Sequence, residues 1–334
     1  MKKLSLFFIG FLLVPALFLT SCDRGEDPGT GVTTPAFDLM TDYMIANDMD
    51  VDKIKVNTDG EKFVVGAPAL ADVDAFIAKY YIMDIRNATD FGTSHISGAK
   101  NVAFGDILTE AANAGGKPIL VVCYTGQTAC YATSLLRLYG YNHTRALKWG
   151  MSGWSPTTSA SWDNKTGDIA NGHANWSYSA APSNNVYDNP SFTSLSQDGG
   201  EILKARVEEV VAAGFKTASG ADVLNSPGNY FINNYFSDAD YSGFGHIKDA
   251  YRIIDHLKLV DDGQKNLDPG SSAKVITYCY TGQTSAVVTA WLQVLGYDAY
   301  SLTFGMNGLY HSNNQWASNQ WGVDSHPKDL PLVH

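Results

Sequence analysis

The sequence predicts an α/β fold of two tandem domains, each with a central parallel sheet and helices on both faces. Short apolar segments that suit buried strands alternate with longer segments of helical periodicity. This alternation is typical of parallel sheets, because parallel strands need a crossover connection between them. The second half of the chain repeats the pattern of the first, so we expect two copies of one domain.

The first half contains these elements in order. Residues 33–50 suit a helix, because Pro35 stands near its start, where proline is tolerated. Residues 69–80 carry apolar side chains at helical spacing. The other elements that we expect are strands at 63–65, 81–86, 119–122 and 145–149, a turn-rich connection at 90–102, a helix at 108–114, and a helix that follows residues 123–128 and ends at Tyr139 before Gly140.

The second half indicates a duplicated domain through its repeated motifs. The hexapeptide Cys-Tyr-Thr-Gly-Gln-Thr occurs at 123–128 and again at 279–284. A Gly-Met-x-Gly motif at 150–153 returns at 305–308. The further correspondences place 230–234 where 81–85 stands and 245–250 where 94–99 stands, after an expected helix at 199–213.

The chain changes character between 155 and 196, where Ser, Thr, Asn and Gly dominate. A long segment without secondary structure is unusual inside a compact domain, so we expect it to lie on the surface and to hold the domain boundary. The predicted organisation is a signal peptide at 1–21, a tether at 22–34, a first domain at 35–182, a linker at 183–197 and a second domain at 198–334.

Composition and charge exclude several classes of partner. The chain has 334 residues, of which 45% are hydrophobic and 17% charged, and a formal net charge of −11. These values are ordinary for a globular protein of two domains. The negative charge argues against nucleic acid and against an anionic membrane surface as partners.

The first residues predict a lipoprotein leader. A basic start is followed by an apolar segment from Leu4 to Leu19. That segment is shorter than the about 20 residues of a membrane-spanning helix. It ends in Leu19-Thr-Ser-Cys22, which resembles a bacterial lipobox. We therefore expect cleavage before Cys22 and a lipid anchor on Cys22, which places the protein at the bacterial cell envelope, facing the periplasm or the cell surface.

The remaining cysteines point to reactive thiols rather than to a disulfide framework. Three are left once Cys22 carries lipid, namely Cys123, Cys130 and Cys279, and an odd number leaves at least one thiol free. Cys123 and Cys279 begin the repeated hexapeptide and are the candidate nucleophiles. Cys130 is expected in the core, and a resolving thiol for Cys123 is the alternative.

Each hexapeptide predicts a turn that stabilises an anionic sulfur. The cysteine follows a parallel strand, at the edge where α/β sheets place their sites. The helix that begins after the turn contributes backbone N–H groups and a partial positive charge, which we expect to lower the thiol pKa. Gly126 and Gly282 permit the positive φ that such a turn needs. The residues expected to bind substrate are Tyr124, Thr125, Gly126, Gln127, Thr128, Tyr280, Thr281, Gly282, Gln283 and Thr284.

Taken in order, the motifs resemble the rhodanese family. They are Asp84-Ile-Arg86, Asp90-Phe91, His95-Ile-Ser-Gly-Ala99, Cys123-Tyr-Thr-Gly-Gln-Thr and Gly150-Met-Ser-Gly-Trp154. The resemblance implies a sulfurtransferase in which Cys123 and Cys279 take a sulfane sulfur from a small donor, hold it as a persulfide, and pass it to a thiol or cyanide. It implies no cofactor, and no spacing of His, Cys and carboxylates indicates a metal site.

The sequence departs from the family's pattern in two ways. Many members that use thiosulfate carry Arg or Lys within the loop, whereas both loops here lack a basic side chain. The second copy places Asn233 and Tyr235 where the first has Asp84 and Arg86. We interpret this second difference as a looser scaffold rather than altered chemistry.

Other functions remain possible interpretations of the same loop. A phosphatase would need an Arg six residues after the cysteine, to hold phosphate, and Ala129 and Ser285 stand there instead. A non-catalytic module that binds persulfide or sulfide is the principal alternative. A redox sensor that uses Cys123 and Cys130 is a third. The sequence gives no indication of oligomeric state.

The supporting residues are expected to hold the loop rather than to react. We expect Arg86 and Asp90 to form an ion pair at the end of the strand that contains Asp84. His95 and His246 are expected to stabilise turns, because a turn that itself stabilises the thiolate needs no separate base.

Overall fold

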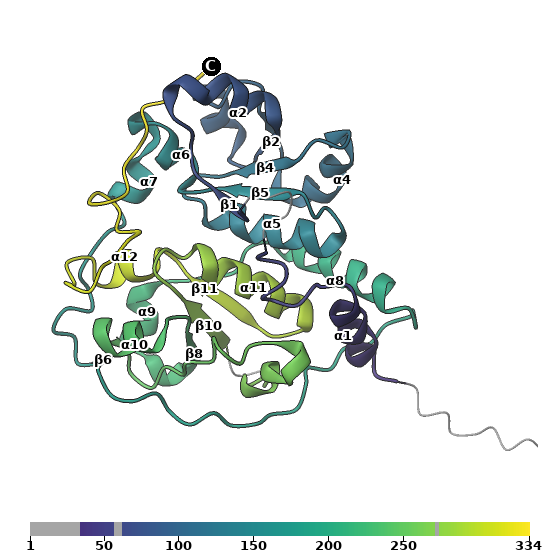
Figure 1. Cartoon of the computed structure of the whole chain (residues 1–334). Coiled ribbons are helices and arrows are strands. Elements are labelled where there is room, and N and C mark those ends of the chain that lie inside the picture. The colour runs from purple at the N-terminus through teal and green to yellow at the C-terminus, as the bar shows by residue number, and fades with distance from the viewer. Residues whose placement is uncertain (1–33, 57–61, 271–273) are drawn as a thin grey trace, which may run out of the picture. The chain divides into compact units, whose positions relative to one another are not determined.

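The computed structural model describes residues 34–56, 62–270 and 274–334, and Pro35–His334 forms one compact unit (Figure 1). The predicted signal peptide and the lipidation site Cys22 lie outside the described residues and stay predictions. Among the residues that are described, no helix is both long enough and apolar enough to span a membrane.

Two parallel sheets confirm the predicted α/β class. The first has the strand order β1-β5-β4-β2-β3, and the second has the order β7-β11-β10-β8. The strands are β1 (Val64–Val65), β2 (Tyr81–Asp84), β3 (Lys100–Asn101), β4 (Ile119–Val122), β5 (Thr144–Leu147), β7 (Thr217–Ala218), β8 (Tyr230–Asn234), β10 (Lys274–Tyr278) and β11 (Ala299–Leu302). Every pairing within these two sheets is parallel.

Helices surround each sheet. The α-helices are α1 (Ala36–Ala46), α2 (Val73–Lys79), α3 (Ala88–Thr93), α4 (Ile107–Ala111), α5 (Gln127–Tyr139), α6 (Gly150–Trp154), α7 (Ala160–Asp163), α8 (Gly199–Ala213), α9 (Gly220–Asn225), α10 (Asp238–Phe244), α11 (Gln283–Leu295) and α12 (Gly305–Leu309). Short 3-10 helices occupy Leu70–Asp72, Phe104–Asp106, Ala112–Ala114, Pro156–Thr158, Pro227–Asn229, Leu259–Asp261 and Gly263–Asn266.

Capping residues fix where several helices begin and end. Asp198 precedes α8 and its carboxylate accepts the backbone N–H of Glu201 at 2.9 Å, as expected of an N-cap. Gly140 and Gly296 end α5 and α11 with φ of 117° and 103°, a region that glycine adopts without steric cost. The predicted stop at Gly140 is confirmed.

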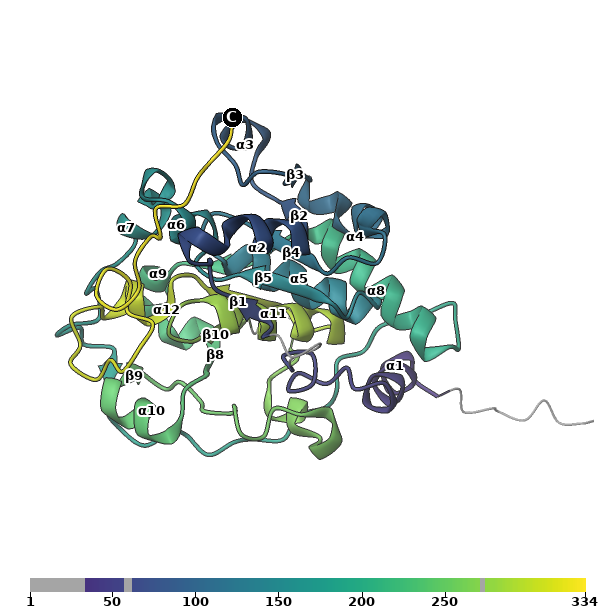
Figure 2. The ribbon, with the colours of Figure 1, turned by 45° about the horizontal axis from the view of Figure 1, so that its top comes forward.

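The central core is shared by the two halves. Helices α5 and α11 pack against each other between the sheets, as Figure 2 shows. Leu135 of α5, Val207 of α8 and Trp291 of α11 are all fully buried in one continuous cluster. Helix α1, the first helix of the described residues, also packs against α8 and so lies on the second half. The repeated helices therefore bury their apolar faces mainly against each other.

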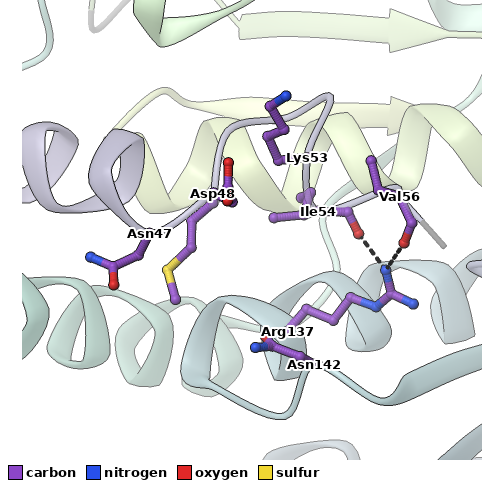
Figure 3. Close-up of a pocket in the computed structure, with 8 residues that line it drawn as sticks. Asn47, Asp48, Lys53, Ile54, Val56, Arg137 and Asn142 are labelled. Carbon is purple, nitrogen blue, oxygen red and sulfur yellow. Dashed lines mark hydrogen bonds between the residues drawn. The ribbon is translucent and has the colours of Figure 1, made fainter. Parts of the chain in front are cut away.

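Arg137 anchors the segment that follows α1 onto α5. Its guanidinium donates to the carbonyl oxygens of Ile54 at 2.7 Å and Val56 at 2.9 Å (Figure 3). The guanidinium also lies 4.6 Å from the centroid of the Phe63 ring. Burial lowers the pKa of Arg137 to about 10, and the neighbouring charge of Arg145 adds to that shift. Because it donates to backbone carbonyls, this buried cation has a structural role.

Segments from each half lie on the other half. The short strand β6 (Trp176–Ser177) pairs antiparallel with β9 (His246–Ile247). Upstream of β6, the N–H of Ala170 donates to Leu309 O at 2.8 Å. In the opposite direction, the N–H of Leu330 donates to Trp154 O at 3.0 Å. The domain bounds that we expect from the sequence stay predictions, and the contacts cross them both ways.

We predict that Gly199→Ala destabilises the protein by about 1–3 kcal/mol, because an added methyl group would overpack the contact between α8 and α1. A Cβ at Gly199 would lie 2.2 Å from Leu39 O and 2.7 Å from Tyr43 Cβ. Urea unfolding measures the loss. Gly228→Ala is the control, because a Cβ there would meet nothing within 4 Å. Equal stability of the two variants would contradict the close packing of α1 on α8.

Candidate active site

Cys123 and Cys279 lie at the carboxyl ends of the two central strands. Cys123 follows β4 and precedes α5, and Cys279 follows β10 and precedes α11. Gly126 and Gly282 directly precede these helices, with φ of 85° and 76°. A residue with a Cβ would be strained at this φ. The glycine in each hexapeptide therefore allows the chain to turn sharply around the cysteine.

Backbone N–H groups point at both sulfur atoms. The N–H groups of Gly126 and Ala129 donate to Cys123 Sγ at 3.1 and 3.3 Å. In the second copy the N–H of Ser285 donates to Cys279 Sγ at 3.4 Å. Two of these three donors stand just after the hexapeptide, in the first turn of the following helix. A negative charge on sulfur is favoured there by these bonds and by the helix dipole.

The short helices α6 and α12 receive the carbonyl oxygens of the loops. The N–H of Met151 donates to Cys123 O at 2.8 Å, and the N–H of Met306 donates to Cys279 O at 3.0 Å. The carbonyl oxygens of Cys123 and Cys279 are thus bound by the short helices beside the loops. A Cβ at Gly150 would lie 2.3 Å from Cys123 O. The first glycine of the Gly-Met-x-Gly motif is therefore required for this close approach.

Burial opposes the N–H donors at Cys123. The exposed fraction of both nucleophile candidates is 2%. Burial raises the pKa of the Cys123 thiol, and the backbone N–H groups of Ala129, Thr125 and Gly126 act in the opposite direction. The expectation that the turn lowers this pKa is wrong for the free protein, because desolvation of the thiolate outweighs its hydrogen bonds.

Four residues of the two hexapeptides are partly exposed, and they occupy the same positions in both copies. They are Tyr124, Thr128, Tyr280 and Thr284, whereas Thr125, Gly126, Gln127, Thr281, Gly282 and Gln283 are buried. Of the predicted substrate-binding residues, only these four reach the surface in the free protein.

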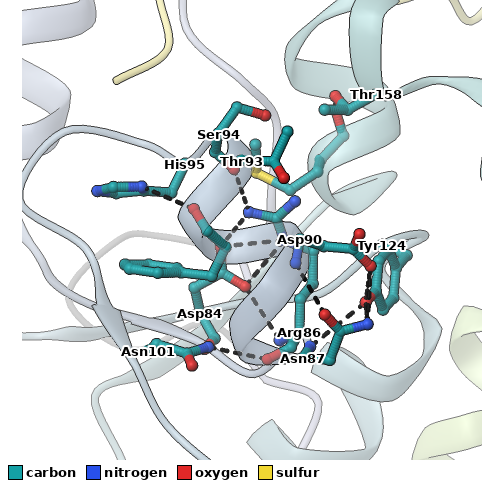
Figure 4. Close-up of polar contacts among 12 residues, drawn as sticks. Asp84, Arg86, Asn87, Asp90, Thr93, Ser94, His95, Asn101, Tyr124 and Thr158 are labelled. Atoms are coloured by element: carbon teal, nitrogen blue, oxygen red, sulfur yellow. Dashed lines mark hydrogen bonds and ion pairs between the residues drawn. The ribbon is translucent and has the colours of Figure 1, made fainter. Parts of the chain in front are cut away.

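Both tyrosines are held by a carboxylate. Tyr124 Oη donates to Asp90 at 2.5 Å and accepts from Asn87 Nδ2 at 2.7 Å (Figure 4). Tyr280 Oη donates to Asp240 in the same way. The bond from Tyr124 lowers the pKa of Asp90. Burial, and then the bond to Asp90, raise the pKa of Tyr124. The phenol thus remains the donor and the carboxylate the acceptor.

The expected ion pair between Arg86 and Asp90 is wrong. Arg86 Nη2 pairs with Asp84 Oδ2 at 2.7 Å, and their side chains are 2% and 0% exposed. The same nitrogen donates to Ser94 O at 2.7 Å. Residues two apart on an extended strand point to the same side, which brings Asp84 and Arg86 together. This buried pair braces the end of β2 beneath α3 (Figure 4).

The strand register corrects the predicted counterparts in the second copy. Asp84 pairs with Val122, one residue before Cys123. Asn234 pairs with Tyr278, one residue before Cys279. Asn234 therefore replaces Asp84, and Phe236 replaces Arg86, whereas Asn233 and Tyr235 are each one residue too early. An amide and an aromatic ring thus take the place of the ion pair.

His95 and His246 pack at equivalent turns of the two copies, and their contacts there are structural. His95 Nδ1 lies 2.9 Å from Phe91 O, and the two rings stack with centroids 3.9 Å apart. His246 Nδ1 lies 3.4 Å from Tyr241 O, and those rings stack at 3.8 Å. Burial lowers the pKa of His246. The two side chains link α3, which follows β2, and α10, which follows β8, to the turns after these helices.

The two hexapeptides meet through their glutamines. Gln127 Oε1 accepts the backbone N–H of Phe304 at 2.9 Å. A Cβ at Gly282 would lie 2.2 Å from this oxygen, and a Cβ at Gly126 would lie 3.1 Å from Gln283 Nε2. Each loop is thus in contact with the glutamine of the other. The sequence contained one indication of this contact between the loops, because Gln occupies the same position in both hexapeptides.

Cys130 lies in the core. Its side chain is fully buried in the cluster that also contains Cys123 and Cys279, and all three thiols are free. Burial raises the pKa of Cys130 well above its ordinary value. This environment favours the neutral thiol, as in an ordinary buried cysteine.

Comparisons with known proteins identify a domain family. Residues 70–157 and 235–312 match the family model of the rhodanese-like domain, and each matched region contains one of the two cysteine loops. No curated protein matches the sequence.

Several solved structures resemble the chain at low identity. The thiosulfate sulfurtransferase from Pseudomonas aeruginosa has 15% identity and a TM-score of 0.29 over 85% of this chain and 49% of that one. This chain therefore spans about half the length of that structure. The 3-mercaptopyruvate sulfurtransferase from Leishmania major has 13% identity and a TM-score of 0.27, over 76% and 75%. A rhodanese-related protein from Thermoplasma volcanium has 19% identity and a TM-score of 0.23, over 26% and 87%.

We predict that Cys123 is alkylated with a pH midpoint above the about 8.5 of an unperturbed cysteine. Burial favours the neutral thiol, so the folded protein keeps this proton to higher pH than the unfolded chain. The associated stability is complete below the unfolded pKa and is lost as the pH rises through the folded pKa. Peptide mass spectrometry after iodoacetamide pulses measures the midpoint, with the chain in denaturant as control. A native midpoint at or below the denatured one would contradict this prediction.

We predict that Asp84→Ala costs about 3–5 kcal/mol, because it leaves the buried Arg86 guanidinium without its carboxylate. The double variant Asp84→Asn with Arg86→Phe copies Asn234 and Phe236 of the second half, and should lose much less. Urea unfolding compares the two. A double variant that is less stable than Asp84→Ala would show that the ion pair is not the main role of these residues.

Proposed function

Since the chain carries two rhodanese-like domains, we propose that it is a sulfurtransferase that moves a sulfane sulfur through a cysteine persulfide. The donor is a small sulfur compound such as thiosulfate, a polysulfide or a persulfide, and the acceptor is a thiol or cyanide. The observation that carries this proposal is the pair of cysteine loops, each with backbone N–H groups directed at a sulfur atom.

The first half-reaction loads the cysteine. The Cys123 thiol loses its proton to water, and the thiolate attacks the outer sulfur of the donor. A new S–S bond forms on Cys123, while the donor's own bond to that sulfur breaks and its electron pair leaves with the departing group, which is sulfite when thiosulfate is the donor. The N–H groups of Gly126 and Ala129 stabilise the negative charge, as donors placed in advance do in other enzymes.

The second half-reaction transfers the outer sulfur from Cys123 to the acceptor. An acceptor thiolate attacks the outer sulfur of the persulfide, forms a new S–S bond to it, and releases the Cys123 thiolate with the electron pair of the bond that breaks. Neither step needs a metal or a basic side chain in the loop. Tyr124 and Thr128 are the partly exposed residues of the first hexapeptide, and we expect a donor to approach Cys123 past them. Tyr280 and Thr284 have the same exposure beside Cys279.

A second candidate function is a module that binds persulfide or sulfide without turnover. The 2% exposed fraction of both cysteines favours it, because a buried sulfur protects a bound sulfur atom from acceptors. The absence of a basic side chain within either hexapeptide also favours it, since an anionic donor is then held by backbone groups alone. The two functions differ in steady-state transfer.

We predict that thiosulfate, polysulfide or a persulfide donor adds one sulfur atom, about 32 Da, to each of Cys123 and Cys279. Intact mass spectrometry detects it, and peptide mapping assigns it to Cys123 or Cys279. Cys123→Ser and Cys279→Ser should each lose one site, and the double variant both. Cys130→Ser is the matched control and should keep both added sulfurs.

The same variants decide between the two candidate functions. A sulfurtransferase should also show continuous transfer to cyanide or a thiol, and that transfer should disappear in the double variant. Loading without turnover would indicate the binding module instead. An added sulfur that persists without both cysteines, or that no donor produces, would rule out the persulfide proposal.

A further inference from the structure

A small cavity lies at the rim of the second cysteine loop. Its volume is about 170 Å³, and it is lined by Asp240, Phe244, Tyr280, Trp316 and residues 317–319. Tyr280 directly follows Cys279, so one wall of the cavity belongs to the loop that carries the candidate nucleophile. Most of the opposite wall, residues 316–319, lies beyond the region 235–312 that matches the family model. This chain thus adds its own wall to the site.

Hydrogen bonds tie that wall to the loop. Asn307 Nδ2 donates to both Tyr280 O and Asn319 O at 3.0 Å. Asn307 Oδ1 accepts the backbone N–H of Trp321 at 2.8 Å. A single buried side chain of α12 therefore fixes residues 319–321 relative to the backbone of Tyr280. The cavity is built into the fold and does not depend on a loose surface segment.

Three aromatic rings surround the cavity. The centroids of Phe244 and Trp316 are 5.1 Å apart, those of Phe244 and Tyr280 are 6.0 Å apart, and those of Tyr280 and Trp316 are 6.4 Å apart. The indole N–H of Trp316 already donates to His311 O at 2.9 Å. Phe244 is fully buried and packs edge-on against the other two rings, which it supports. Tyr280 and Trp316 are partly exposed, so they offer their π-systems to the cavity, and such systems attract cations.

Asp240 adds a negative charge to this aromatic cavity. Its carboxylate accepts hydrogen bonds from Tyr280 Oη and, at 2.7 Å, from Ser237 Oγ. Both donors are neutral hydroxyl groups. Within residues 34–56, 62–270 and 274–334, no basic side chain forms an ion pair with Asp240. An anionic ligand is repelled here, whereas a cation gains both the carboxylate and the rings.

The equivalent rim of the first loop differs in the side chain that lies beside the tyrosine ring. Tyr124 is bound to Asp90 as Tyr280 is to Asp240. The Arg86 guanidinium, however, lies 5.8 Å from the centroid of the Tyr124 ring. At the corresponding place the Phe236 ring stacks on Tyr280 at 4.5 Å. Arg86 is neutralised by its buried ion pair with Asp84. The two rims therefore differ in the group beside the tyrosine ring, which is a paired guanidinium in the first and an apolar ring in the second.

We propose that this cavity binds an organic cation, a trialkylammonium or protonated amine group, and that it selects sulfur substrates of Cys279 that carry such a group. The assignment to a sulfur substrate rests on the proposed sulfur transfer, whereas the binding of the cation does not. The two loops then differ in specificity although their hexapeptides are identical.

The test is calorimetric titration of the purified protein with choline. The comparison ligand is the neutral alcohol in which carbon replaces the ammonium nitrogen of choline, which keeps the shape and removes the charge. Choline should bind at one site and at least about tenfold more tightly than the alcohol, since cation–π attraction and the carboxylate act only on the charge.

Variants locate the site. Asp240→Asn and Trp316→Leu should each weaken choline binding about fivefold or more, and Trp316→Phe, which keeps an aromatic face, should retain most of it. Asp90→Asn is the matched control in the first domain and should leave choline affinity unchanged. Equal affinity for choline and the alcohol, no binding of choline, or the same loss in Asp90→Asn as in Asp240→Asn would overturn the proposal.

The experiments test the cation site and the sulfur transfer independently, so one proposal can be contradicted while the other stands. Choline titration needs no sulfur donor, so cation binding with no added sulfur in the mass experiment would overturn the sulfur transfer and leave the cation site standing. Urea unfolding of each variant verifies that it is folded. If Trp316→Leu does not fold, Trp316→Phe and Asp240→Asn still decide, because affinity that Asp240→Asn does not reduce contradicts the role of the carboxylate.

Discussion

The outward turn of the loop carbonyls is the constraint on which the rest of the site depends. A peptide unit that directs its N–H at the sulfur must direct its C=O elsewhere, and a buried carbonyl needs a donor. The peptide unit that points the Gly126 N–H at Cys123 Sγ carries the Thr125 carbonyl, which accepts the indole N–H of Trp162 at 3.0 Å. The carbonyls of Cys123 and Cys279 themselves accept N–H groups from the first turns of α6 and α12. The price is strain, since Trp149 and Phe304, which precede these helices, have φ of 64° and 62°, where bulky residues are rare. That both copies retain it indicates that the arrangement is needed twice.

Duplication has kept the loops and changed their surroundings. The first copy supports its loop with a buried ion pair, Asp84 and Arg86. The second uses an amide and a ring, Asn234 and Phe236, at the same positions. Buried ion pairs and well-packed apolar groups can stabilise a fold about equally, so this exchange is tolerated structurally. Its effect falls on the rim, where the guanidinium beside the Tyr124 ring is replaced by the Phe236 ring on Tyr280.

Local features of this protein could be predicted from the sequence, and contacts between distant residues could not. The parallel sheets, the cysteine loops and the stop of α5 at Gly140 follow from periodicity and glycine chemistry. The ion-pair partner of Arg86 could have been predicted, because alternation along a strand places Asp84 on the same side as Arg86 and so favours it over Asp90. The one-residue error at Asn233 arose because repeated motifs do not fix strand register.

The protonation of Cys123 and the meeting of the two loops needed the tertiary structure. Burial depends on how α5 packs on α11, and no pattern within the loop reports it. The contact of Gln127 with Phe304 joins residues that are 177 positions apart in the sequence. The identical hexapeptides indicated that both loops matter. An identical sequence can result from shared chemistry or from shared packing, so it did not predict that the two loops touch.

Segments of each half pack on the other half, so the cooperative folding unit is larger than the duplicated domain. Residues near Ala170 complete the second half, and residues near Leu330 complete the first. The segment near Ala170 follows the first cysteine loop but packs on the second half. The segment near Leu330 follows the second cysteine loop but packs on the first half. Cutting the chain in the middle would leave two incomplete cores, so the ancestral single domain cannot be regained by division. We expect one cooperative unfolding transition in calorimetry, and two separate transitions would exclude this view.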